Sequence, residues 1–175
     1  MNINFIIIQL IGILAWLFLF TSYYRENTNK ILIFQIISAI LFGIHYYLLG
    51  AHTAIYICIF AIIIDYSYYK TDLDRYIFYI SIPIYIIIGI FNYKIMIDIL
   101  PIISSLIDGY TLTKHKKIVI IGAIVSYTLW IIYDLNVKSY TGAITDMILA
   151  ISNLSILLFK YNIFKKDEIV HKLNP

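Results

Sequence analysis

Polar and small side chains lie at helical spacing within two long apolar stretches of the sequence. In each stretch they follow one another at intervals of four, three and four residues: Ala54, Cys58, Ala61 and Asp65 in the first, and Gly142, Asp146, Leu149 and Asn153 in the second. Such intervals place the four residues of a set on one face of a helix. A polar group in hydrocarbon is costly unless it meets a partner or water, so these faces are candidates for binding a polar solute.

Two interpretations of these faces are open. In the first, Asp65, Asn153, Asp146 and Cys58 line a substrate pathway between the two helices, and the acids favour a cationic or proton-coupled substrate. In the second, the small residues only let helices pack closely. Asp65 then lies near one end of its stretch, among the lipid headgroups.

Three further residues each have a chemical and a structural interpretation. His45 binds substrate or relays protons, or it makes a hydrogen bond between helices near the outer interface. Trp130 stacks on a flat ligand, or it is a packing residue. Pro101 removes a backbone hydrogen bond and kinks its helix beside Asp98, and this kink is either a gating hinge or fixed.

The sequence contains no motif of a known catalytic or cofactor site. HExxH, GxSxG, a phosphate-binding loop and a glycine-rich dinucleotide turn are all missing from it. The single cysteine, Cys58, excludes an internal disulfide and a CxxC site. Lys and Arg lie between hydrophobic segments rather than on one basic face, which argues against nucleic-acid binding. We therefore expect no enzyme activity, no cofactor, no metal ion and no nucleic-acid partner.

The elements that position these residues must be membrane helices. Of the 175 residues, 62% are hydrophobic and 13% are charged, and the mean hydropathy is +0.88. A soluble domain of this size could not bury so much apolar surface. A spanning helix takes about 20 residues, which leaves room for seven helices and short loops. We expect an all-α polytopic membrane protein with spans at 4–24, 31–49, 53–69, 76–91, 95–112, 118–135 and 140–159.

The basic residues predict the orientation of these spans. Of the 13 Lys and Arg residues, only Lys94 and Lys138 fall on one side of the predicted bundle, and the rest fall on the other. Because Lys and Arg are enriched on the cytoplasmic side, the N-terminus is expected outside and the C-terminus in the cytoplasm. The first apolar stretch lacks a preceding basic region and a cleavage site, so we expect it to be a retained helix.

The first and last parts of the chain match each other at an offset of 87 residues, which becomes 88 after one inserted residue. Lys30 then meets Lys117, and Asp65 meets Asn153. The match predicts two three-helix units at 1–70 and 95–160, a linker helix within 71–94, and a basic cytoplasmic tail at 161–175. Three helices end on the side of the membrane opposite to where they began, and the single linker helix returns the chain to the first side. The second unit therefore enters with the same orientation as the first, and this 3+1+3 arrangement is a parallel repeat.

Residues 42–54, FGIHYYLLGAHTA, resemble the signature of the YgjV family of bacterial inner membrane proteins, with an echo at 130–133 and 140–143. The resemblance covers roughly residues 5–160. It implies a multi-pass protein of the bacterial inner membrane, similar in architecture to the SWEET and PQ-loop transporters. The chain departs from the PQ-loop pattern because Gln9 and Pro101 are not adjacent, and this departure argues against sugar transport in particular.

Two functions fit these features. The first is a transporter that moves a small polar metabolite by alternating access through a site between the third and seventh helices. The second is a non-transporting membrane protein, such as a partner subunit, a sensor or an immunity factor, in which the polar faces only pack helices. Both place the chain in a lipid bilayer, and both are compatible with a homo-oligomer.

Overall fold

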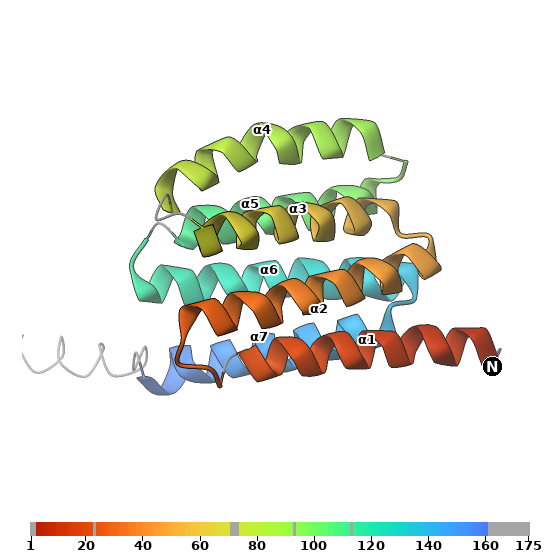
Figure 1. Cartoon of the computed structure of the whole chain (residues 1–175), viewed down its shortest axis with the longest axis horizontal. Coiled ribbons are helices and arrows are strands. Elements are labelled where there is room, and N and C mark those ends of the chain that lie inside the picture. The colour runs from red at the N-terminus through yellow and green to blue at the C-terminus, as the bar shows by residue number, and fades with distance from the viewer. Residues whose placement is uncertain (1–2, 23, 71–73, 93, 113, 161–175) are drawn as a thin grey trace, which may run out of the picture.

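The computed structural model describes residues 3–22, 24–70, 74–92, 94–112 and 114–160. These residues form seven α-helices and one short 3-10 helix, without strands (Figure 1). The helices are α1 (Ile3–Ser22), α2 (Thr28–Leu49), α3 (His52–Lys70), α4 (Asp74–Asn92), η1 (Met96–Ile99), α5 (Leu100–Leu112), α6 (Lys116–Val137) and α7 (Tyr140–Lys160). The expectation of an all-helical protein is confirmed for the described residues. The predicted basic tail at 161–175 lies outside them.

Helices α2 and α6 have the same length and end in the same way. The side chain of Asn27 caps the start of α2 by accepting hydrogen bonds from the backbone N–H groups of Asn29 and Lys30. Both helices have 22 residues. Their C-cap residues, Gly50 and Lys138, are each in the left-handed conformation. The bounds of α2 and α6, and the first residues of α3 and α7, are all 88 residues apart. From α2 to the start of α3, the structure thus favours an offset of 88 residues over one of 87. The repeat itself stays a prediction.

The expected helix at 95–112 is divided in two. The carboxylate of Asp98 accepts hydrogen bonds from the backbone N–H groups of Lys94 (3.0 Å) and Ile95 (3.1 Å), which stabilises the turn of η1. Pro101 has no N–H to donate, so it suits the first turn of α5, where it lies. Pro101 therefore begins α5 rather than kinking it, and the expected mid-helix kink was wrong. A hinge at the junction of η1 and α5 stays a prediction.

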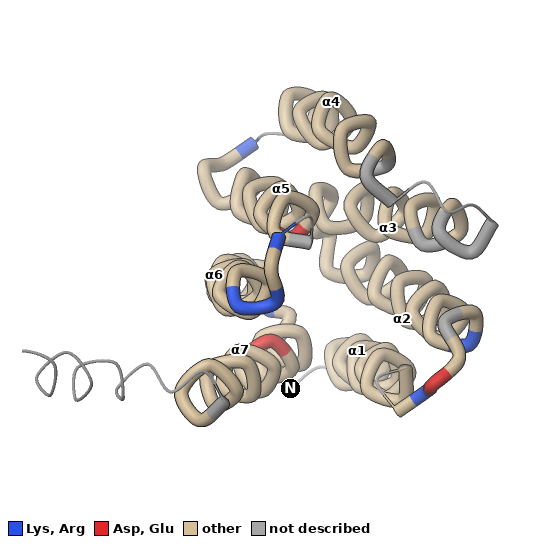
Figure 2. Tube along the Cα trace, turned by 90° about the vertical axis from the view of Figure 1, so that its left-hand side faces the viewer, with Lys and Arg blue, Asp and Glu red and all other residues tan. Residues whose placement is uncertain are grey.

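The helices form two groups of three with α4 beside them. Helices α1, α2 and α3 pack in sequence, as do α5, α6 and α7 (Figure 2). The groups meet where α1 contacts α7 and where α3 contacts α5, and α4 packs against α3 and α5. The α1–α2 and α5–α6 connections lie at one end, which we call the basic end, with Arg25, Lys30, Lys114, Lys116 and Lys117 (Figure 1). Lys94 and Lys138 belong to connections at the opposite end.

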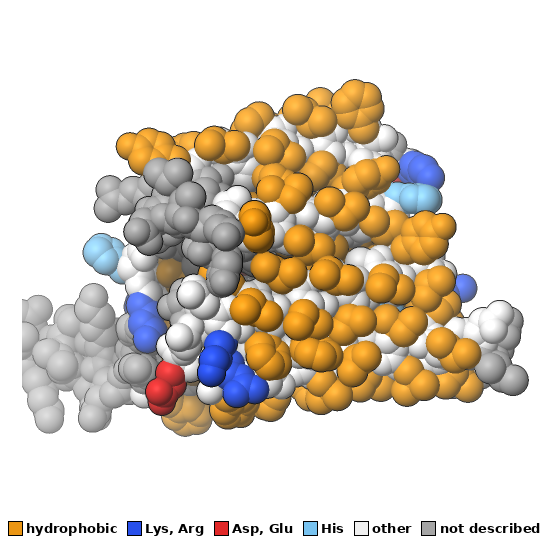
Figure 3. Space-filling view, viewed as in Figure 1, with side chains coloured by type: hydrophobic (Ala, Val, Ile, Leu, Met, Phe, Trp, Pro, Cys, Tyr) orange, Lys and Arg blue, Asp and Glu red, His pale blue; other side chains and the backbone are white. Residues whose placement is uncertain are grey.

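The molecule carries apolar side chains outside and many polar side chains inside. Large apolar residues such as Leu10, Ile90 and Phe91 are more than half exposed. Hydrophobic side chains cover the middle of the face seen in Figure 3. The buried polar residues include Ser38, His45, Thr53, Ser104, Ser126, Asp134, Ser139 and Thr145. This is the distribution expected of a protein whose surroundings are lipid rather than water.

Four of the seven predicted spans are supported by helix length and composition. Helices α1, α2, α6 and α7 each contain a segment long and apolar enough to cross a membrane. Helices α3 and α4 have shorter apolar segments, His52–Ile64 and Phe78–Asn92, and α5 has 13 residues. That α3, α4 and α5 also cross the membrane stays a prediction.

Candidate functional site

A cavity of about 310 Å³, here called the central cavity, lies among the helices of both groups. Among the described residues, every α-helix except α4 contributes to its wall. Its lining is Leu19, Gln35, Ser38, Ala39, Phe42, Tyr46, Ile57, Cys58, Ala61, Asp108, Tyr127, Trp130, Gly142, Thr145 and Asp146. A volume of this order suits a small molecule.

Three of the residues predicted to bind substrate line this cavity. Cys58 comes from α3, Trp130 from α6 and Asp146 from α7. Ala61 and Gly142 lie there too, so the small and polar faces expected on α3 and α7 are turned toward the same space. Asp65 belongs to α3, but the structure does not describe its side chain.

Asn153 lines a second cavity of about 720 Å³, here called the vestibule. Its side-chain N–H also donates to the carbonyl of Leu149, one turn earlier in α7 (2.9 Å). The vestibule shares Gln35, Asp108 and Tyr127 with the central cavity. It also touches Tyr24, Thr111 and Val119, which lie where α1, α5 and α6 approach the basic end. The vestibule thus adjoins the central cavity on the side of the basic end.

The acids of the central cavity differ in their partners. The Ser126 hydroxyl donates to Asp108 Oδ2 (2.6 Å), and the Ser104 hydroxyl lies 2.5 Å from that of Ser126. Asp146 has no hydrogen-bond or ion-pair partner among the described residues. It does interact electrostatically with Asp134 and Asp108. Asp108 is therefore held by α6, whereas Asp146 is left to face the cavity.

His45 does not line the central cavity but lies between it and the opposite end, with no exposed surface. Its Nδ1 donates to the carbonyl oxygen of Ile8 in α1 (2.8 Å), because a carbonyl can only accept. Its Nε2 lies 2.9 Å from the Ser139 hydroxyl, in the α6–α7 connection. The structure therefore shows the interhelical hydrogen bond that was one of the two interpretations of this residue.

Gln9, in α1 like Ile8, also binds to the α6–α7 connection and to the start of α7. Its amide N–H donates to the carbonyl of Lys138 (2.9 Å), and its amide oxygen accepts from the backbone N–H (3.0 Å) and hydroxyl (3.1 Å) of Thr141. We call Gln9, His45, Ser139 and Thr141 the closing cluster. Together they hold α1 and α2 against the α6–α7 connection at the opposite end.

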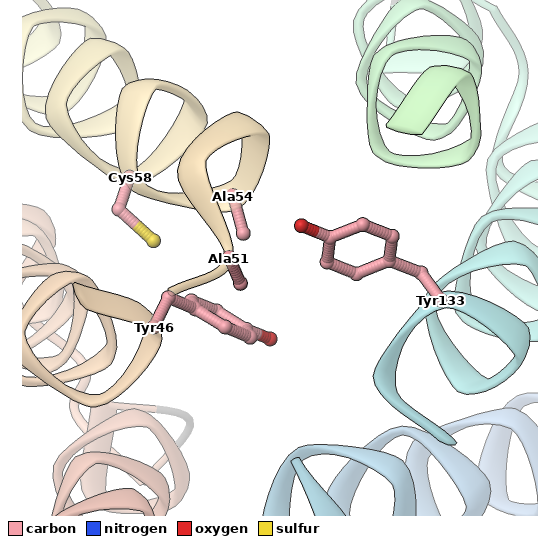
Figure 4. Close-up of a cluster of buried hydrophobic side chains, with 5 residues drawn as sticks. All are labelled: Tyr46, Ala51, Ala54, Cys58 and Tyr133. Carbon is pink, nitrogen blue, oxygen red and sulfur yellow. The ribbon is translucent and has the colours of Figure 1, made fainter. Parts of the chain in front are cut away.

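The side chain of Tyr46 lies at the boundary between the central cavity and the closing cluster. Its hydroxyl donates to Asp134 Oδ1 (2.9 Å), and its ring is stacked near Phe42 (6.1 Å) and Trp130 (6.0 Å). Figure 4 shows Tyr46 on one side and Tyr133, from α6, pointing toward the start of α3. These buried rings fill the space between the two helix groups.

Several residues of the site carried no sequence signal of their role. Asp134 lies in the last turn of α6, where an acid also fits an interfacial position, and its partner Tyr46 is 88 residues earlier. Gln9 and Ser139 gain their roles from contacts that join α1 and α2 to the α6–α7 connection and to the first turn of α7. Asp108 shares a helix face with Ser104 and Ser105, and only the approach of Ser126 from α6 shows which hydroxyls it meets.

Apolar helices around a polar interior, with a cavity enclosed by two three-helix groups, define a polytopic helical membrane protein. A family model described as Imp-YgjV, bacterial inner membrane protein, matches residues 6–162. The chain belongs to this family, and its location is the bacterial inner membrane. No curated protein and no solved structure matches it.

The hydrogen bond between Tyr46 and Asp134 gives a test of the buried polar boundary. Tyr46→Phe removes the hydroxyl that donates to Asp134, whose fully buried carboxylate then has one hydrogen-bond partner fewer. We therefore expect the free energy of unfolding to fall by about 1–3 kcal/mol. Tyr47→Phe is the matched control, because Tyr47 is 70% exposed, and it should change the free energy by less than about 0.5 kcal/mol. Unfolding in detergent measures both, and equal values would contradict the assignment.

Proposed function

We propose that the protein is a transporter that moves a small polar molecule across the inner membrane by alternating access, with the central cavity as its binding site. One observation carries this proposal. The cavity is lined by α1, α2 and α3 together with α5, α6 and α7, it joins the vestibule on one side, and the closing cluster separates it from the other side. A solute bound there contacts both groups, and a small rocking of one against the other changes which end is open.

Residues 88 positions apart support the parallel repeat that such a motion needs. Tyr46 and Asp134 are separated by this interval and bind each other. Phe42 and Trp130, and likewise Cys58 and Asp146, have the same separation and line the same cavity. Equivalent positions that converge on one site are expected when two parallel units are related by an axis through that site. This is also the basis for proposing a 3+1+3, SWEET-like and PQ-loop-like architecture with seven spans.

The distribution of basic residues supports an orientation for the cycle. With the basic end in the cytoplasm, the N-terminus lies outside, and the vestibule opens the central cavity toward the cytoplasm. The closing cluster then seals the outer side. This is the arrangement of an inward-facing transporter.

The test is uptake by purified protein reconstituted into vesicles and offered a mixture of small polar metabolites, with the vesicle contents identified by mass spectrometry. We expect at least one compound to accumulate above the level in protein-free vesicles. Asp146→Asn and Trp130→Leu should each lower its initial rate by about tenfold or more, because both residues line the cavity. Asp65→Ala and Asn153→Ala test the remaining predicted site residues in the same assay.

Glu26→Gln is the control variant, because Glu26 is an exposed acid in the α1–α2 connection and lines neither cavity. Its uptake should equal that of the unaltered protein. If no compound accumulates and the protein co-purifies with another membrane protein, the non-transporting alternative replaces this proposal.

A further inference from the structure

The central cavity carries charge of one sign among the described residues. Asp108 and Asp146 line it, and no Lys, Arg or His side chain does. Asp134 adds a third carboxylate that interacts with Asp146. A carboxylate removed from water is costly unless a positive group or hydrogen-bond donors compensate it. A cation is therefore the solute that best balances this cavity, and an anion is the solute that it repels.

Asp146 is the acid that most needs such a partner. Asp108 already accepts a hydrogen bond from Ser126 at 2.6 Å. No described residue donates to Asp146 or forms an ion pair with it, although it lies in the second turn of α7, in the wall of the central cavity. Its carboxylate is thus available to a solute that brings its own positive charge and N–H donors.

Aromatic rings form much of the wall that faces this acid. Phe42, Tyr46, Tyr127 and Trp130 line the same cavity. The rings of Tyr46 and Trp130 are stacked with their centroids 6.0 Å apart and their planes 27° apart. Aromatic faces attract cations through the ring quadrupole, most strongly where water is excluded, and they also accept an apolar group.

We propose that the central cavity binds a small organic cation of the alkylammonium or guanidinium class. Its positive group lies at Asp146, and its apolar part lies against Trp130 and Tyr46. The inference rests on the proposed function, because it names the class of solute that the transporter accepts. The proposal requires both the Asp146 carboxylate and the aromatic rings, so replacing either one has its own expected result.

Cys58 provides a reporter inside the cavity, because it lines the wall and is the only cysteine of the chain. Two thiol reagents, trimethylammonioethyl methanethiosulfonate and sulfonatoethyl methanethiosulfonate, differ mainly in the sign of their charge. We expect the ratio of the cationic to the anionic rate at Cys58 to exceed the ratio for a free thiol in solution by about tenfold. Asp146→Asn should bring the ratio down toward the value for the free thiol, and Glu26→Gln should leave it unchanged.

Protection of Cys58 tests the ligand class directly. Benzylammonium, benzyl alcohol and benzoate share a ring and differ in the charge of the head group. Benzylammonium should slow the modification of Cys58 in the unaltered protein, whereas benzyl alcohol and benzoate should protect it little. Trp130→Leu should weaken the protection by about threefold to tenfold. Gel filtration and the unfolding midpoints first show that Asp146→Asn and Trp130→Leu are folded.

The outcomes separate this inference from the proposed function. Equal protection by all three compounds, or a charge ratio equal to that of the free thiol, overturns the inference even if the vesicles accumulate a neutral or anionic metabolite. Selective protection by benzylammonium, abolished by Asp146→Asn, supports the inference even if no compound is transported.

Discussion

Replacement of Gly142 by alanine is expected to destabilise the folded protein by about 3 kcal/mol. A Cβ at this position would overlap the carboxylate oxygen Oδ2 of Asp134 and the Ser139 hydroxyl, and it would lie 2.9 Å from Asp134 Cγ. Neither neighbour can move away freely, because Asp134 binds Tyr46 and Ser139 binds His45. The added methyl group must therefore separate α7 from the end of α6 or break one of these hydrogen bonds.

Gly43→Ala is the matched control, since Gly43 also lies within a long helix, α2. Its added Cβ would meet only the Cβ of Cys58, at 3.6 Å, which is ordinary van der Waals contact. Because alanine favours a helix over glycine by up to about 1 kcal/mol, this variant should be as stable as the parent or slightly more so. Unfolding of both variants in detergent provides the comparison. Equal stabilities would show that α7 does not approach Asp134 as closely as the structure has it.

The helical order of the protein could be predicted from the sequence because lipid imposes it. Apolar stretches separated by charged connections indicated the positions of the helices, and intervals of three and four residues indicated that Cys58, Ala61, Gly142 and Asp146 face the interior. Those positions do line one cavity. The pattern could be recognised because helical spacing is local, so every residue of a face is visible within one stretch.

The closing cluster could not be predicted in this way, because its contacts join distant parts of the chain. Gln9 and Thr141 are 132 residues apart, and His45 and Ser139 are 94 apart. In the sequence, His45 was compatible with a role in binding or with a hydrogen bond between helices. Only the positions of Ile8 and Ser139 beside it show the hydrogen bond, and a role in binding stays a prediction. The kink expected at Pro101 was wrong for a local reason: the carboxylate of Asp98 stabilises the turn of η1, and α5 begins only at Leu100, directly before Pro101.

On the proposed transport cycle, a disulfide between positions 12 and 141 is expected to stop uptake. The Cβ of a residue at position 12 would meet the Thr141 side chain, so cysteines at both positions could pair and join α1 covalently to α7. In the proposed alternating-access cycle, the end that the closing cluster seals must open, and the cluster must then separate. In the oxidised Gly12→Cys/Thr141→Cys variant, the initial rate of uptake should therefore fall by about tenfold or more, and dithiothreitol should restore it.

Formation of the bond is measured by counting thiols with a maleimide polymer in denaturing detergent, where only Cys58 should react after oxidation. The single variants Gly12→Cys and Thr141→Cys are the controls, and each is compared with its own reduced form, because both changes touch the closing cluster. Oxidation should leave the uptake of each single variant unchanged. A second measurement needs no substrate: in the locked protein, the cationic thiol reagent should reach Cys58 from the basic end but not from the opposite end. If the reagent still reaches Cys58 from both ends, or if uptake continues at its full rate, then α1 and α7 do not separate at this end during transport, and the closing cluster is a fixed part of the fold.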